Sequence, residues 1–312
     1  MRVHIVGSGP TGMSIAWEIL KTKKYEVIIY DRKKSAGGSW WEPEGNKRDI
    51  HAHRIVFGNA FKNTNDLFNE MGISWNEMFE PGDSRVYTTI LKYLNPKDYM
   101  ALSSLAVRVL SNQNKYKSIT LKDAIGELSE TGKNAISTLT LIMDGVTWDV
   151  MSSYEFVKSF DHVGLSKQYT QRVSGKIMSD KMQKALINQG AVFKFNAELT
   201  NVDYGKDEYI GIFEDGSLIN DGMLIMAIDH GKAINLVKNN WGEDIQKKLG
   251  PNTYGCINIL FDYDEEIYLQ KTDLEYAMET EFKIQPVVLS DRKTISCVIC
   301  DLTEEILTTD PD

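Results

Sequence analysis

Three glycines close to the N-terminus, Gly7, Gly9 and Gly12, have the spacing of a loop that cradles phosphate groups. An apolar run at residues 3–6 precedes them, and residues 11–20 carry apolar side chains at helical spacing. This order predicts a strand, a glycine loop and a helix. Gly7 would permit the tight turn, Gly9 would let the backbone approach a pyrophosphate, and Gly12 would let the helix pack close to the strand. Ser8, Pro10 and Thr11 complete the loop, where free N–H groups of the first helical turn attract anions.

An acidic residue follows at the distance expected for binding a ribose. Asp31 ends a second predicted strand, residues 27–30, and comes nineteen residues after Gly12. Arg32 beside it suggests an adenosine 2′-phosphate, as in NADP, but that interpretation requires a carboxylate that is absent or turned away. No second glycine triplet of this type follows, so the sequence predicts no separate nicotinamide domain.

The bulk properties exclude several classes of partner. The chain has 312 residues, a net charge of −9 and a pI of about 5.2, which disfavours nucleic acid and anionic membranes as main partners. No apolar stretch reaches the roughly 20 residues that span a bilayer, and no signal peptide is evident, although peripheral membrane contact stays open. Cys297 and Cys300 lie on a predicted strand and would point to opposite faces, so we interpret them as structural thiols. The sparse use of cysteine favours a cytoplasmic protein.

Further elements follow from caps and periodicity. Asn95 and Pro96 predict the start of a helix that runs to about residue 110, and residues 90–165 are mostly helical in pattern. Ser179 is the predicted N-cap of a helix that ends at Gly190. Other predicted segments are a helix at 63–71, a helix start at Thr120, strands at 191–195, 199–204, 209–213 and 223–228, and a second sheet from 252–262, 287–289 and 294–301.

Three segments together resemble the flavin amine oxidase superfamily, which includes phytoene-type desaturases and amine oxidases. The first is 7–38, where Gly37 and Gly38 after the acidic strand resemble the extended fingerprint of FAD-binding flavoproteins. The second is 49–60 with 65–73, and the third is 190–202 with 215–216 and 224–229. The resemblance implies FAD as cofactor, held by Gly7, Ser8, Gly9, Pro10, Thr11, Gly12, Asp31, Arg32, Gly37, Gly38, Ser39, Trp40, Leu199 and Ala227.

The resemblance also implies an α/β fold in which a three-layer, ββα, Rossmann-type FAD domain is interleaved with a substrate domain. Residues 1–85 and 166–235 would form the FAD domain. Residues 86–165 and 236–312 would form the substrate domain, with a helical cap and a mixed sheet. The expected activity is hydride transfer from a C–H bond of an amine or an apolar, polyene-like small molecule to flavin N5. The resemblance says nothing of the oligomeric state.

The chain departs from the family pattern at several positions. Ser39 stands where the family has an arginine, and Trp40 is similar to the Gly-Gly-x-Trp of flavin monooxygenases, so an NADPH-dependent enzyme of that class is an alternative. The family's late Gly-Asp segment is not found, which suggests a chain that lacks the C-terminal FAD-binding segment, and a truncated, non-catalytic nucleotide-binding protein is a further alternative.

Candidates for catalysis come only from the resemblance. His53 and Arg54 would lie near the flavin, although His53 is equally well explained as a structural loop residue. Trp40 and Trp41 are more simply explained as packing anchors than as flavin walls. No metal site is predicted, because His162 and His230 have no partners at metal-ligand spacing.

Overall fold

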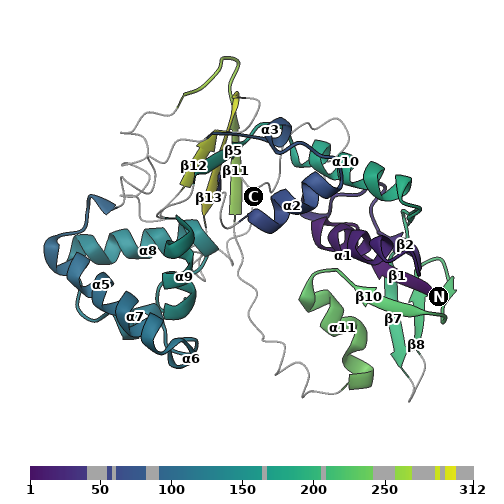
Figure 1. Ribbon diagram of the computed structural model, residues 1–312, viewed down its shortest axis with the longest axis horizontal. Helices are drawn as coiled ribbons and strands as arrows, with labels where there is room; N and C mark the ends of the chain where they lie inside the picture. Colours follow the sequence, from purple (N-terminus) through teal and green to yellow (C-terminus); the bar gives the residue numbers. More distant parts are fainter. Residues whose placement is uncertain are drawn as a thin grey trace, which may run out of the picture. The chain divides into compact units, whose positions relative to one another are not determined.

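The computed structural model describes residues 1–40, 55–57, 61–81, 91–163, 167–204, 209–241, 257–268, 285–288 and 292–299 (Figure 1). Its contacts divide the chain into two compact units that alternate along the sequence. Unit 1 comprises residues 1–53, 63–79 and 171–253, and unit 2 comprises residues 54–62, 80–170 and 254–312. The functional domains expected from the sequence, with boundaries at 85, 165 and 235, stay a prediction.

Unit 1 is built on a four-stranded parallel sheet. The strand order is β10-β1-β2-β6, and every neighbouring pair is parallel. The strands are β1 (Arg2–Val6), β2 (Glu26–Tyr30), β6 (Val192–Lys194) and β10 (Met223–Met226). Because β1 lies between β2 and β10, chain segments more than 190 residues apart in sequence end side by side at the carboxyl edge of the sheet.

Helices cover one face of this sheet. Helix α1 (Pro10–Lys21) contacts β1, β2 and α10 (Gly175–Asn188). Its buried residues Met13, Ala16, Trp17 and Leu20 recur at intervals of three and four, which places them on one helical face. The strand residues that alternate toward this side are apolar and buried, as expected for a parallel sheet that is covered on both faces: Val3, Ile5, Val27 and Ile29.

A second, antiparallel sheet covers the other face. Strands β7 (Leu199–Tyr204), β8 (Tyr209–Phe213) and β9 (Leu218–Ile219) form a meander in that order. Its buried residues pack with Val6 and Tyr30 of the parallel sheet, and α11 (His230–Trp241) adds Val237 to the same cluster. The unit therefore has the expected three-layer ββα architecture with a Rossmann-type core.

Unit 2 holds a helical cluster and a separate sheet. The helices are α5 (Pro96–Ser111), α6 (Gln113–Tyr116), α7 (Leu121–Ile125), α8 (Glu130–Asp144) and α9 (Ser153–Val163). Residues from all five helices form one apolar core, which includes the fully buried Leu105, Leu121 and Ile136. Strands β11 (Ile257–Asp262), β12 (Gln285–Val288) and β13 (Thr294–Ile299) pair antiparallel in the order β11-β13-β12.

Helix caps at two predicted starts are present. Asn95 caps α5 through a reciprocal capping box with Asp98, and Thr120 Oγ1 accepts the N–H of Asp123 at the start of α7. The predicted helices at 63–71 and 96–110 correspond to α2 (Lys62–Glu70) and α5. The strands at 199–204 and 209–213 have the predicted bounds.

One predicted helix start is wrong. Ser179 lies inside α10, fully buried, and its hydroxyl donates to the carbonyl of Lys176, whereas the N-cap position is Ser174. Gly175 begins the helix, and a Cβ on it would lie 2.8 Å from Cβ of Trp40. The helix therefore begins where tertiary packing admits only a glycine, and a local capping signal could not show this.

Several short elements had no counterpart in the sequence prediction. They are the 3₁₀ turn η1 (Gly38–Trp40), the helix α3 (Trp75–Met78), strand β9, and the sheet β3-β5-β4, made of β3 (Ile55–Phe57), β4 (Phe79–Pro81) and β5 (Gln168–Gln171). The predicted ends of the second-sheet strands at 252–256, 289 and 300–301 lie outside the described residues.

Candidate functional site: a pocket at the glycine loop

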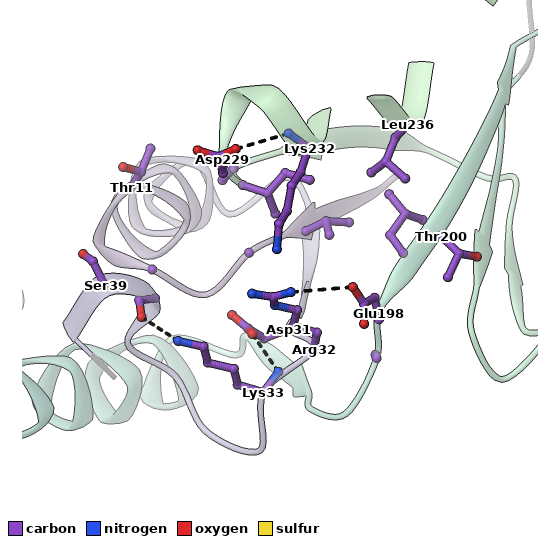
Figure 2. A pocket seen from close by; sticks show the side chains of 18 of the residues that line it. Thr11, Asp31, Arg32, Lys33, Ser39, Glu198, Thr200, Asp229, Lys232 and Leu236 are labelled. Carbon is purple, nitrogen blue, oxygen red and sulfur yellow. Dashed lines mark hydrogen bonds and ion pairs between the residues drawn. The ribbon is translucent and has the colours of Figure 1, made fainter. Parts of the chain in front are cut away.

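A pocket of about 740 Å³ opens at the carboxyl edge of the parallel sheet (Figure 2). Val6 ends β1, and Asp31 and Ala227 directly follow β2 and β10. Ligands of open parallel sheets bind at this edge, outside the carboxyl ends of the strands. The full lining consists of Val6, Gly7, Gly9, Pro10, Thr11, Asp31, Arg32, Lys33, Gly38, Ser39, Ala197, Glu198, Leu199, Thr200, Ala227, Ile228, Asp229, Lys232, Asn235 and Leu236.

The floor of the pocket is bare backbone. Gly7 has φ +106°, and a Cβ on it would collide with the carbonyl oxygen of Ala227. A Cβ on Gly12 would collide with the carbonyl oxygen of Gly7, and one on Gly38, which has φ +56°, would lie 2.6 Å from Cα of Gly9. The two glycine segments therefore meet without side chains, which leaves their backbones open to a ligand.

The N-terminus of α1 faces this floor. Its N-cap residue is Gly9, no side chain caps the helix, and Pro10 occupies the first turn. Helices α5, α7 and α8 carry side-chain caps from Asn95, Thr120 and Ser129, whereas α10, like α1, has no side-chain cap. An uncapped helix start presents free N–H groups and the positive end of the helix dipole, which together favour a phosphate.

Asp31 joins the glycine loop to the second strand. It is buried, its Oδ2 accepts hydrogen bonds from the Ser8 N–H at 2.8 Å and the Ser8 hydroxyl at 2.6 Å, and its Oδ1 accepts from the Lys33 N–H at 2.9 Å. A carboxylate offers about four acceptor positions, so Oδ1 retains one for a ligand hydroxyl. Asp31 thus holds the loop in place and also lines the pocket.

Cationic side chains also line the pocket near Asp31. Lys33 Nζ donates to the carbonyl of Gly38 at 3.0 Å, and Arg32 Nη1 lies 3.8 Å from Glu198 Oε1. Burial lowers the pKa of Lys33, and the positive charges of Arg32 and Lys232 add to this lowering while Asp31 opposes it. Figure 2 shows Lys232 extending from α11 toward Arg32 and Asp31.

The structure brings most of the predicted cofactor residues to one place. Ten of the fourteen line the pocket directly: Gly7, Gly9, Pro10, Thr11, Asp31, Arg32, Gly38, Ser39, Leu199 and Ala227. Ser8, Gly12 and Gly37 lie in or beside the two glycine segments, outside the lining. Trp40 packs against Gly175 at the start of α10, in the role of a packing anchor.

The sequence did not predict the other ten lining residues, which we call the far wall. Lys33, Ala197, Glu198, Thr200, Ile228, Asp229, Lys232, Asn235 and Leu236, with Val6, complete the lining. For the lining residues of α11, the sequence offers one indication, which is the buried strand before them. A polar residue that directly follows a buried parallel strand lies at the carboxyl edge of the sheet, where ligands bind. His53, Arg54 and Trp41 lie outside the described residues.

Within the described ranges, no group of three or more His, Cys, Asp or Glu side chains is placed to hold a metal ion. Nor does any helix in those ranges have the length and apolar character to cross a membrane.

Comparisons with known proteins agree with this architecture. Residues 5–71 match the family described as NAD(P)-binding Rossmann-like domain, and this range includes both Gly9 and Gly38. No curated protein matches the sequence. An oxidoreductase from Methanosarcina mazei superposes with a TM-score of 0.72 at 16% identity, over 98% of this chain and 81% of the other. A predicted protoporphyrinogen oxidase from an Exiguobacterium species gives 0.63 at 12% identity, over 98% of this chain and 80% of the other.

Putrescine oxidase bound to putrescine also superposes, with a TM-score of 0.64 at 12% identity, over 100% of this chain and 78% of the other. This chain has the amine oxidase-like fold. The amine oxidase-like fold accounts for the interleaving of the two units along the sequence, because these superpositions extend over both of them.

Proposed function

We propose that this chain is an FAD-dependent oxidoreductase that transfers a hydride from a C–H bond of a small molecule to flavin N5. The substrate class is an amine or an apolar, polyene-like compound. The observation that carries the proposal is the meeting of Gly9 and Gly38 beneath the uncapped start of α1, in a pocket of about 740 Å³. The fold, which it has in common with oxidases of amines, supports the same conclusion.

The residues present fit the dinucleotide. The start of α1 and the bare glycine backbone suit the diphosphate, and Asp31 Oδ1 suits a ribose hydroxyl. Leu199 and Ala197 offer an apolar wall for the adenine. When bound, FAD supplies the hydride acceptor. The chain's own contribution at this pocket is to bind and orient. His53 and Arg54 stay candidates for catalysis near the flavin.

The enzymatic part of the proposal is tested by anaerobic reduction. The purified chain is loaded with FAD, and its flavin absorbance is followed while amines and polyenes are added in turn. We expect one of these classes to bleach the oxidised flavin band. If members of both classes leave a bound flavin oxidised, the proposed substrate class is wrong although FAD binding stands.

A second candidate is an NADPH-dependent enzyme of the flavin monooxygenase type. The observation in its favour is η1, where Gly38, Ser39 and Trp40 form a 3₁₀ turn and Ser39 lines the pocket in place of the family's arginine. Bleaching of the bound flavin by NADPH alone would support this candidate. A chain that binds FAD but responds neither to substrates nor to NADPH would be a non-catalytic nucleotide-binding protein. Under each alternative we propose a cytoplasmic protein whose partner is a small molecule.

A further inference from the structure

The far wall of the pocket is tied to the glycine loop through the backbone. The Ala227 N–H donates to the carbonyl of Val6 at 2.7 Å, and the Ala227 carbonyl occupies the space that a Cβ on Gly7 would need. Helix α11 begins three residues later, at His230. The first turn of α11 is therefore held in register with the loop that would take the diphosphate, and Lys232 projects from this turn.

The acidic side chains that line the pocket are already engaged. Asp31 accepts from Ser8 and from the Lys33 N–H. Asp229 Oδ1 accepts the N–H of Lys232 at 3.2 Å, so it caps α11. Glu198 faces Arg32. Each of these three acids thus already has a partner among the lining residues, although Asp31 Oδ1 keeps one acceptor position for a ligand hydroxyl.

The cations are engaged unequally. Lys33 is held by the carbonyl of Gly38 and Arg32 by Glu198. Lys232 Nζ has no hydrogen bond or ion pair to any residue that the structure describes, although its side chain lines the pocket and points inward (Figure 2). Its charge acts on Lys33, because it contributes to the lowered pKa of that ammonium group. A long cationic side chain aimed into a phosphate-type pocket suits an anionic oxygen of a ligand.

We propose that Lys232 is a phosphate-binding residue of this pocket, which reaches the diphosphate of the bound dinucleotide from the α11 side. This inference rests on the proposed function, because it needs a diphosphate at the glycine loop. The ammonium group complements the start of α1: the helix offers N–H groups from one side and Lys232 a point charge from the other. Because Lys232 lines the pocket and is also exposed to solvent, salt will screen its contribution.

The test compares ligands with and without phosphate. Adenosine, ADP and FAD are titrated calorimetrically against the full chain, against Lys232→Met, and against Lys24→Met. Methionine keeps much of the length and removes the charge. Lys24 is an exposed lysine outside the pocket lining, so its replacement makes the same change in net charge.

We expect Lys232→Met to weaken the binding of ADP and FAD by about tenfold and to leave the affinity for adenosine unchanged. Lys24→Met should change none of the three affinities. Lys232→Arg should restore most of the ADP affinity, and the gap between wild type and Lys232→Met should narrow as salt rises. Unchanged ADP affinity in Lys232→Met, or equal losses for adenosine and ADP, would overturn the inference while FAD binding by the wild type keeps the proposed function. A wild type that binds neither ADP nor FAD would overturn both.

Discussion

Gly38 and Gly9 meet backbone to backbone, so that a Cβ on Gly38 would lie 2.6 Å from Cα of Gly9. This contact joins the segment after β2 to the loop after β1. It explains why a glycine stands at position 38, more than twenty residues after the first glycine segment, since the backbone of Gly9 leaves no room for a side chain there.

Replacing Gly38 should therefore abolish the site with little effect on the rest of the fold. We expect Gly38→Ala to weaken FAD binding by more than about tenfold, measured by titration of flavin fluorescence. The matched control is Gly216→Ala, because Gly216 also has a positive φ, +80°, but nothing lies within 4 Å of its would-be Cβ. Both variants should lose about 1 kcal/mol of unfolding free energy from the backbone conformation. Equal FAD affinity in the two variants would show that the glycine contact has no part in binding.

Asp31 should affect binding through the loop as well as through the ligand. Asp31→Asn keeps the size of the side chain but removes the charge that accepts from Ser8, and we expect about tenfold weaker FAD binding. Ser8→Ala removes one of the bonds to Oδ2 and keeps the carboxylate, so its effect should be smaller. Equilibrium titration of the two variants side by side measures this order. A larger loss in Ser8→Ala would assign Asp31 a purely structural role.

The local geometry of the first forty residues could be predicted from the sequence because each requirement there is local. A turn with positive φ at Gly7, a close approach at Gly9 and an acid at the end of a buried strand are all visible in residue types and spacing. The far wall of the pocket could not be predicted. Lys232 and Asn235 reach the pocket only because β10 joins the sheet beside β1, and sheet order is not written in any local pattern.

The misplaced start of α10 has a similar cause. Serine is a good N-cap anywhere a helix begins, but α10 begins where Trp40 leaves room only for Gly175, and this is a contact across 135 positions of sequence. The two-residue strand β9 is too short to show periodicity at all.

In unit 2, Asp98 should make the stability of the helical cluster sensitive to acid. Its carboxylate is fully buried and accepts from the Asn95 N–H, the Ser129 N–H and the Ser129 hydroxyl, so it joins the starts of α5 and α8. Burial opposes its ionisation, but the hydrogen bonds from Ser129 and Asn95 prevail and lower the pKa of Asp98. Since the folded pKa is the lower one, the stabilisation is present above the unfolded value of about 4 and is lost as the pH falls below it.

The corresponding experiment is denaturant unfolding between pH 7 and pH 3. Wild type should lose unfolding free energy as the pH falls below about 4, and Asp98→Ala should lose about 2 kcal/mol at pH 7 and show a weaker dependence on pH. Asp123→Ala, at an exposed position in the first turn of α7, is the control. Parallel pH profiles for wild type and Asp98→Ala would refute this role.

A buried polar pair on neighbouring strands of the parallel sheet offers a further check on the fold. His4 Nδ1 lies 3.0 Å from the Tyr30 hydroxyl, and His4 Nε2 lies 3.1 Å from Asp221 Oδ1. Burial raises the pKa of Tyr30, and the negative charge of Asp221 adds to this, so the hydroxyl stays protonated at neutral pH. Replacing His4 by leucine would leave that hydroxyl without its ring partner.

We expect His4→Leu to cost about 2 kcal/mol of unfolding free energy and Tyr30→Phe about 1 kcal/mol. The double variant should cost less than the sum, because the second substitution removes a group that the first has already stranded. Chemical unfolding of the four proteins of this cycle measures the coupling. If the costs of the two single substitutions simply add, the contact between His4 and Tyr30 contributes nothing to the free energy of unfolding.

Whether the pocket at the glycine loop binds FAD is tested by the visible absorption spectrum of the purified chain after incubation with FAD and desalting. We predict a retained oxidised-flavin band at close to one FAD per chain in wild type and in Gly216→Ala, and none in Gly38→Ala. A wild-type spectrum without a flavin band, or a band that survives in Gly38→Ala, would show that FAD does not bind at the glycine loop.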